Sequence, residues 1–233
     1  MHVEIDIPGT DSQGRVFVTW TPVQATARLV DAIGSTTTIR VIFGNGGTVG
    51  RLNFPPTRTG TFGSWVTRKL PVSGAAVPFC IAARFGRPSS SYGDAAIRAV
   101  QRTVGTLLAT KPLMVRVRKN AQTLGAAERD RFLAALGTLN GSGQGRFTDF
   151  RDMHVQASST EAHGNVGFLP WHRAYVLDLE RELQRIDPAV TLPYWRFDQP
   201  APALFTAAFM GASGPNDAVQ FTPGPPLEQW TTD

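Results

Sequence analysis

The sequence contains a single cysteine, Cys80, among 233 residues. One thiol cannot form an internal disulfide, and it cannot supply the paired thiolates of a zinc ribbon. Cys80 stands in the apolar stretch 77–81, so we predict a small buried core residue. Charged residues make up only 18% of the chain and hydrophobic residues 42%. This balance supports a packed core and excludes a disordered protein.

Long apolar runs are also missing. No run of 18 apolar residues occurs, so the sequence predicts no membrane-spanning helix. The opening MHVEIDIPG has neither the basic nor the apolar region of a secretory signal. The sequence does not fix the compartment but favours a cytoplasmic location, and we expect no association with membranes.

Acidic residues are scarce in the first part of the chain. Residues 1–110 carry 11 Arg and Lys against 5 acids, whereas residues 111–233 carry 12 against 13. The basic residues of the first part are scattered singly, apart from the adjacent Arg68 and Lys69. No run or helical row offers a track for phosphates, so we expect no nucleic-acid binding.

Residues 1–105 alternate between apolar and polar side chains with a period of two, which is typical of strands. Pro- and Gly-rich turns separate these segments. The predicted strands are 3–7, 15–20, 38–43, 49–54, 64–69, 77–84 and 95–100. Short strands at this spacing indicate a sandwich or a barrel. We predict an all-β sandwich over 1–105 that serves as an accessory domain.

From about residue 120 the apolar residues recur with a helical period. A first helix is predicted from an N-cap at Thr123 to the stop at 140–143, a second over 147–155, and a third from Pro170 to Asp187. The buried face of the first helix is predicted at Phe132, Leu133, Leu136 and Leu139. Residues 106–233 should therefore be mainly α-helical, a segment of a helical bundle. The stretch 200–233 should be irregular backbone packed on it.

Three of the four histidines fall between positions 154 and 172. His154 shares a helix face with Phe150, and His172 precedes Leu179 on the apolar face of the third helix. His163 lies in the link between these helices. We predict that the three imidazoles converge, with nitrogens about 3–4 Å apart. Three neutral nitrogens suit copper, zinc or iron, and the lack of a thiolate favours copper. The alternative is that they are unrelated core histidines.

The segment 163–175, HGNVGFLPWHRAY, resembles the first copper-binding segment of the tyrosinase family. This family includes tyrosinases, catechol oxidases and copper oxygen carriers. Leu192-Pro193-Tyr194-Trp195 resembles the next landmark of the family, and Val117–Asn120 resembles the stretch before the first helix. The resemblance covers residues 112–233, and the first hundred residues have no part in it.

The resemblance implies that His154, His163 and His172 are the ligands of the first copper. It places the ring of Phe168 beside the site. Support of the helix and of its ligand is implied for Trp171, Arg173 and Glu180. For Arg173 and Glu180, ordinary helix packing and a surface ion pair is an equal alternative. Where some relatives have a cysteine for a thioether link this chain has Glu161, and where relatives have an aspartate it has Arg196, with Asp198 two residues later.

The function implied is copper-dependent oxidation of phenols and o-diphenols to o-quinones by dioxygen. The family uses two coppers and six histidines, yet no histidine follows His172. We therefore expect a fragment that carries the first copper site, with the remaining half or a second chain supplying the other ligands. The stretch 225–230 resembles the part before that half. The alternatives are an oxygen carrier, or a vestigial one-copper homologue with a sandwich binding module.

A missing half would leave an open apolar trough at the histidine face, with Phe150, Val176, Leu179 and Leu183 beside the three imidazoles.

Overall fold

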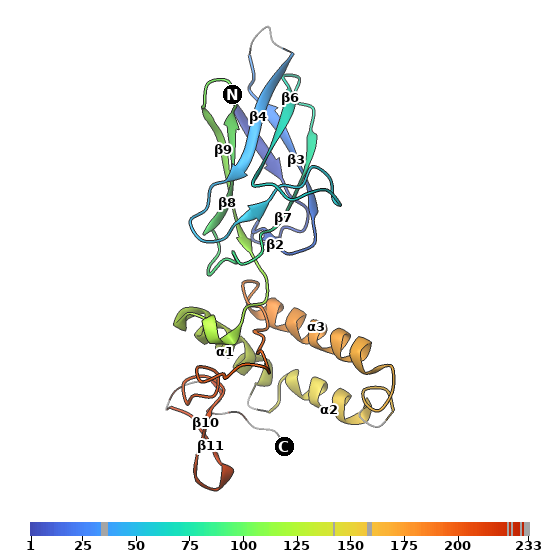
Figure 1. The fold of residues 1–233 in the computed structure, drawn as a ribbon, viewed down its shortest axis with the longest axis vertical. Helices are drawn as coiled ribbons and strands as arrows, with labels where there is room; N and C mark the ends of the chain where they lie inside the picture. The colour runs from blue at the N-terminus through green and yellow to red at the C-terminus, as the bar shows by residue number, and fades with distance from the viewer. Residues whose placement is uncertain are drawn as a thin grey trace. The chain divides into compact units, whose positions relative to one another are not determined.

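The computed structural model describes residues 1–33, 37–141, 143–157, 160–222, 224, 226–228 and 230 (Figure 1). The chain forms two compact units, Met1–Val117 and Arg118–Asp233. The boundary lies after Val117 rather than after residue 105, because strand β9 (Leu107–Val115) pairs with β8 and belongs to the first unit.

Strands make up all the regular structure in the described part of the first unit. In chain order they are β1 (His2–Asp6), β2 (Phe17–Val18), β3 (Val23–Val30), β4 (Thr38–Asn45), β5 (Leu52–Asn53), β6 (Trp65–Pro71), β7 (Val77–Ala83), β8 (Ala95–Gln101) and β9. One sheet has four strands in the order β1-β3-β7-β5, and the other has five in the order β2-β9-β8-β4-β6. The pairs are antiparallel except for β2 with β9.

Both sheets contribute to one hydrophobic cluster. Phe43 of the five-stranded sheet stacks on Phe79 of the four-stranded sheet, with ring centroids 4.4 Å apart. Cys80 is buried, as predicted. The prediction omitted β3 and β9. In β3 the inward positions include Ala25 and Ala27, whose small side chains give a weak strand signal although both are buried.

The second unit contains the helices of the described chain. They are η1 (Ala121–Thr123), α1 (Ala126–Asn140), α2 (Phe147–Ala157), α3 (Phe168–Ile186) and η2 (Pro215–Asp217), with the short strands β10 (Ala212–Ser213) and β11 (Val219–Gln220). None of these helices has the length and apolarity that crossing a membrane requires.

The predicted helix starts differ from the observed ones. Gly125, not Thr123, is the N-cap of α1, because Thr123 lies in η1 and its hydroxyl donates to the Asn120 carbonyl at 2.9 Å. Helix α3 begins at Phe168 and so includes Pro170 in its first turn. The end of α1 agrees with the sequence, since Gly141 is left-handed with φ of 54° and closes the helix.

The apolar stripe of α1 is the core of the second unit. Phe132, Leu133, Leu136 and Leu139 are buried, as predicted. They form a cluster with Leu183 of α3 and with Leu204 and Phe209 of the segment that follows Pro200. That segment is not wholly irregular, because β10 and β11 pair antiparallel within it. Its buried residues join the cluster formed by α1.

We expect Phe43→Ala to lower the free energy of unfolding by about 3–5 kcal/mol, because it empties a fully buried ring site between the two sheets. Urea unfolding of the full chain, followed by hydrogen exchange in β4 and β7, measures this. Phe85→Ala is the control: its ring is 86% exposed and its loss should cost under about 0.5 kcal/mol. Equal effects would contradict the packing described.

Candidate metal centre

A contact between Phe150 and Tyr175 joins helices α2 and α3. Phe150 is buried, and the two rings meet edge to face with centroids 5.7 Å apart. The Tyr175 hydroxyl donates to the carbonyl of Phe150 at 3.1 Å. Burial raises the pKa of Tyr175, so the hydroxyl remains a donor well into the alkaline range. The turn of α2 that precedes His154 is thereby fixed against the turn of α3 that follows His172.

The structure brings His154, His163 and His172 together. Their ring centroids are 5.1 Å apart for His154 and His163, 5.6 Å for His154 and His172, and 5.2 Å for His163 and His172. One ligand nitrogen from each ring lies within 4.8 Å of the other two. All three side chains are half-buried. A group of three imidazoles without a carboxylate suits copper, zinc or iron rather than magnesium or calcium.

The orientation of His172 is set by the backbone. Its Nδ1 lies 2.8 Å from the carbonyl oxygen of Phe168, one turn earlier in α3. A carbonyl only accepts hydrogen bonds, so Nδ1 carries the proton and the Nε2 lone pair of the neutral ring is left for a metal. Such an outer hydrogen bond is typical of histidines that bind metals.

Aromatic rings surround the three imidazoles. The Phe168 ring lies 4.3 Å from His172 and 5.8 Å from His163, beside the site as the resemblance implied. The Trp171 ring lies 5.0 Å from His172 and 5.7 Å from His154, and it stacks on Tyr175 at 5.0 Å. Tyr175 is not among the site residues predicted from the sequence. Its position three residues after His172 is the signal that could have identified it.

Arg173 and Glu180 have different surroundings. Arg173 is exposed. Glu180 is 8% exposed and accepts hydrogen bonds from Arg118, at 2.9 Å for the shortest, and from the backbone N–H of Leu192 at 2.9 Å. The support of the metal ligand that the resemblance implies for Glu180 stays a prediction. The carboxylate ties the start of the second unit to the stretch that follows α3.

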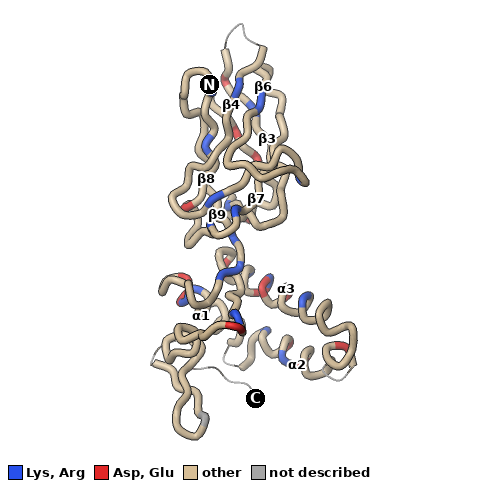
Figure 2. Tube along the Cα trace, in the orientation of Figure 1, with Lys and Arg blue, Asp and Glu red and all other residues tan. Residues whose placement is uncertain are grey.

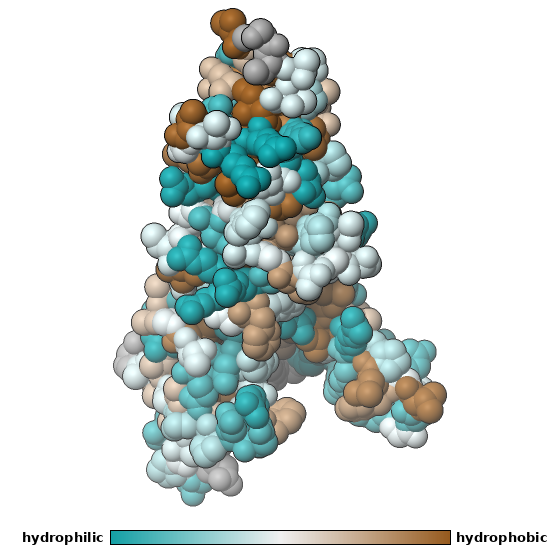
Figure 3. All heavy atoms as spheres, turned by 45° about the horizontal axis from the view of Figure 1, so that its top comes forward, coloured by the Kyte–Doolittle hydropathy of each residue, from teal (hydrophilic) through white to brown (hydrophobic). Residues whose placement is uncertain are grey.

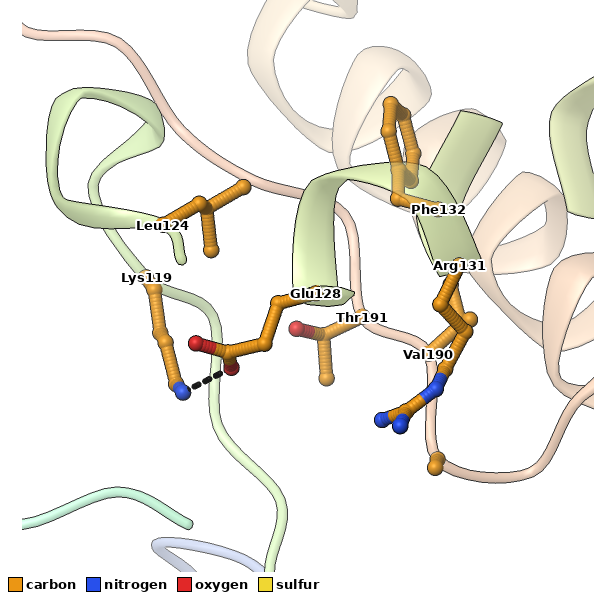
Figure 4. Close-up of a pocket in the computed structure, with 8 residues that line it drawn as sticks. Lys119, Leu124, Glu128, Arg131, Phe132, Val190 and Thr191 are labelled. Atoms are coloured by element: carbon orange, nitrogen blue, oxygen red, sulfur yellow. Dashed lines mark hydrogen bonds and ion pairs between the residues drawn. The ribbon is translucent and has the colours of Figure 1, made fainter. Parts of the chain in front are cut away.

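The segment 117–120 makes further ties of this kind. Lys119 forms an ion pair with Glu128 of α1, at the edge of a small cavity of about 30 Å³ (Figure 4). Asn120 accepts from the N–H of Gln122 and forms a bridge with Tyr194. The two stretches that the sequence singled out as family landmarks therefore lie against each other in the fold.

Arg196 pairs with Asp198 at 2.6 Å. The hydrogen bond from Arg196 lowers the pKa of the Asp198 carboxyl. Asp198 thus gives Arg196 a local partner two residues away.

The expected apolar trough is only partly present. Phe150 and Leu183 are buried within this chain, because Tyr175 packs on the first and the α1 cluster encloses the second. Val176 and Leu179 remain partly exposed. Helices α2 and α3 and the link between them nevertheless expose large apolar side chains (Figure 3), namely Met153, Val155, Val166, Phe168, Leu169 and Leu177.

A wide apolar groove of about 690 Å³ lies elsewhere in the second unit. It is lined mainly by residues of α1, Leu179, Leu192 and the segment after 209. Of the stretch 225–230, Pro225 and Gln229 lie outside the described residues, as do 231–233.

Comparison with known proteins identifies the same part of the chain. Residues 144–232 match the family profile described as the common central domain of tyrosinase. Grixazone synthase of Streptomyces griseus is 41% identical over 115 residues, which cover 43% of this chain and 37% of that protein. The tyrosinase of Streptomyces glaucescens is 42% identical over 108 residues, covering 42% of this chain and 39% of its own length. Chicken tyrosinase is 30% identical, over 50% of this chain and 30% of its own.

The chain therefore matches well under half the length of these relatives. Among solved structures, a mutant of Bacteroides uniformis beta-glucuronidase 2 aligns with a TM-score of 0.22 and 12% identity, a likeness too weak to indicate a fold.

We expect Glu180→Gln to lower the free energy of unfolding by about 1–3 kcal/mol, because it removes the charge from a buried acceptor that Arg118 and Leu192 share. Urea unfolding measures this loss. The control is Asp178→Asn, which breaks an exposed pair with Arg181 and should cost under about 1 kcal/mol. The histidine ring signals in NMR should stay in place in both variants. A shift in those signals with unchanged stability would instead assign Glu180 to the metal centre.

Proposed function

We propose that His154, His163 and His172 bind one copper ion, which serves the oxidation of phenols or o-diphenols to o-quinones by dioxygen, because residues 144–232 match the profile of the tyrosinase central domain. The observation that carries this proposal is the three imidazole nitrogens within 4.8 Å of one another. Neutral nitrogens are good ligands for both oxidation states of copper, and the family is a copper family.

The donor set fits the ion. A metal about 2 Å from each nitrogen needs nitrogens about 3–4 Å apart. Small rotations of the half-buried rings that bring the nitrogens closer by up to about an ångström would therefore complete the site. The hydrogen bond from Nδ1 of His172 to Phe168 presents Nε2 to such an ion. When bound, copper supplies the electron transfer between the phenol and dioxygen.

The protein's own contribution is position and access. Tyr175 and Trp171 hold the α2 and α3 turns that carry His154 and His172. Phe168, 43% exposed and in contact with His172, offers an apolar ring against which an aromatic substrate would pack. Exposure of this ring leaves the histidine group open to a small phenol.

The complete activity requires more than this chain. The family's chemistry uses six histidines, and the only histidine outside the group is His2, in the first unit. We propose that the second trio comes from the remaining half of the domain or from a second chain. We interpret the first unit as an accessory sandwich, since its two sheets share one core and no histidine cluster lies in its sequence.

The apo chain should bind one Cu²⁺, and replacing any of the three histidines by alanine should weaken binding at least about tenfold, because losing only the outer hydrogen-bond partner of a ligand already costs that much. Competition against a chelator measures the affinity, and electron paramagnetic resonance should show nitrogen hyperfine structure. His2→Ala is the matched control and should bind as the wild type. Unchanged affinity in His163→Ala would remove this residue from the site.

The copper-loaded chain alone should not produce quinone from a monophenol or a catechol above the rate of free copper. Three imidazoles hold one ion, whereas the family's reaction uses two. Absorbance of the quinone gives the rate, and the chain loaded with zinc serves as the blank. Steady quinone formation that is lost in His172→Ala would contradict the one-copper proposal and indicate ligands shared between copies.

A further inference from the structure

Four basic side chains lie on the outer face of the five-stranded sheet. Arg40 of β4 stands directly opposite Lys69 of β6. On the other side of β4, the N–H of Arg102 donates to the Arg40 carbonyl at 2.9 Å, which continues the row. Arg98 of β8 stands opposite Gly44. Since neighbouring strands are about 4.8 Å apart, Lys69, Arg40 and Arg102 place three charges along about 10 Å.

We call Arg40, Lys69, Arg98 and Arg102 the cationic face. Figure 2 shows the basic positions of β4 and β6 side by side. The inward neighbours Val41 and Phe43 are buried, whereas all four cationic side chains are exposed. The alternation of the strands therefore fixes the charges on the side that faces solvent.

The cationic face has no countercharge in the described part of the first unit. None of its four side chains takes part in an ion pair there. Residues 1–117 hold 13 Arg and Lys but only 5 acids. Four of these acids contact residues outside the cationic face: Glu4 contacts Arg28, Asp11 contacts Arg15, Asp31 contacts His2, and Asp94 accepts from the Ser90 and Ser91 amides. The fifth, Asp6, lies on β1, which belongs to the other sheet.

This arrangement is costly for the fold. Like charges directly opposite each other on one face of a sheet destabilise it. Arg40 and Lys69 are such a pair, and Arg102 adds a third charge beside Arg40. An anion bound across the row would relieve this repulsion, so the charge pattern is complementary to a polyanion.

An exposed ring adjoins the charges. Trp65 is 60% exposed and stands opposite Gly44, on the other side of which lies Arg98. A Cβ added at Gly46 would lie 2.2 Å from Cγ of Arg98, so the stem of this arginine crosses the bare backbone of Gly46. Glycines thus form a flat floor between an indole ring and a guanidinium group.

We propose that this face binds an extended acidic polysaccharide, whose carboxylates or sulfates pair with the cationic face while the C–H face of a sugar ring stacks on Trp65. A sugar ring has such an apolar face together with an equatorial acid group, and a flat sheet accommodates an extended chain. Single-stranded nucleic acid is less well matched, because its binding sites stack successive bases on several aromatic rings and this row offers one. The proposal is independent of the copper site.

The test uses the full chain and polygalacturonate, with polyglutamate as an anionic polymer that lacks a sugar ring. We expect binding to polygalacturonate that weakens linearly in log K with log salt. Arg40→Ala with Lys69→Ala should reduce affinity for both polymers at least tenfold. Trp65→Ala should reduce affinity for polygalacturonate about fivefold or more and leave polyglutamate unchanged. Melting temperatures of the double variant should be equal to or above that of the wild type.

Arg84→Ala is the control, since it removes an exposed charge from the end of β7, outside the cationic face. It should bind polygalacturonate within twofold of the wild type. The proposal is overturned if the chain does not bind polygalacturonate at low salt, or if Arg84→Ala weakens binding as much as the double variant. It is also overturned if oligo-dT or vesicles of anionic phospholipid bind more tightly than polygalacturonate.

Discussion

The packing of Phe150 against Tyr175 is the contact on which the candidate metal centre depends. Phe150 is one helical turn before His154, and Tyr175 is one turn after His172, so fixing these two rings fixes both ligand turns. The hydroxyl of Tyr175 adds a hydrogen bond to the Phe150 backbone, which prevents α2 from sliding along α3. Both helices also have apolar side chains that this chain leaves exposed, such as Val155 of α2 and Leu169 of α3. This contact, together with the ring of Trp171, therefore sets the relative position of the turns that carry His154 and His172.

Electrostatic ties hold the frame around this contact. Arg118 and the Leu192 amide meet on the buried carboxylate of Glu180, while Lys119 meets Glu128 at the start of α1. A buried carboxylate is tolerated only when its oxygens are satisfied, and here donors from both chain stretches satisfy them. The stretches 117–120 and 192–195 thus stabilise the second unit through contacts with α1 and with Glu180 of α3, away from the first turn of α3. His154 and His172 are positioned by helices α2 and α3, and His163 by the link between them.

The features that depend on local periodicity, such as the helices, could be predicted from the sequence. The features that depend on contacts between distant residues could not. Apolar spacing located α1, α2 and α3 and pointed His154 and His172 to the same side. The N-cap at Thr123 was wrong because a separate turn, η1, precedes the helix. Strand β3 was missed because alanine fills two of its three buried positions. The role of Glu180 was undecidable, since its partners Arg118 and Leu192 are 62 and 12 residues away.

The cationic face illustrates the same limit from the opposite direction. In the sequence its four residues are spread over 40–102, and single basic residues at such distances gave no reason to expect a polyanion site. Antiparallel register converts this spacing into proximity, because β4 pairs with β6 on one side and β8 on the other. The second unit differs: its net charge is −3, and Asp178, Glu182 and Asp198 each pair with an arginine two or three residues away. In the second unit, helical and turn spacing places these carboxylates beside an arginine of the same element or turn. In the first unit, the register of the five-stranded sheet brings four positive charges together, and the proposed polyanion would compensate them.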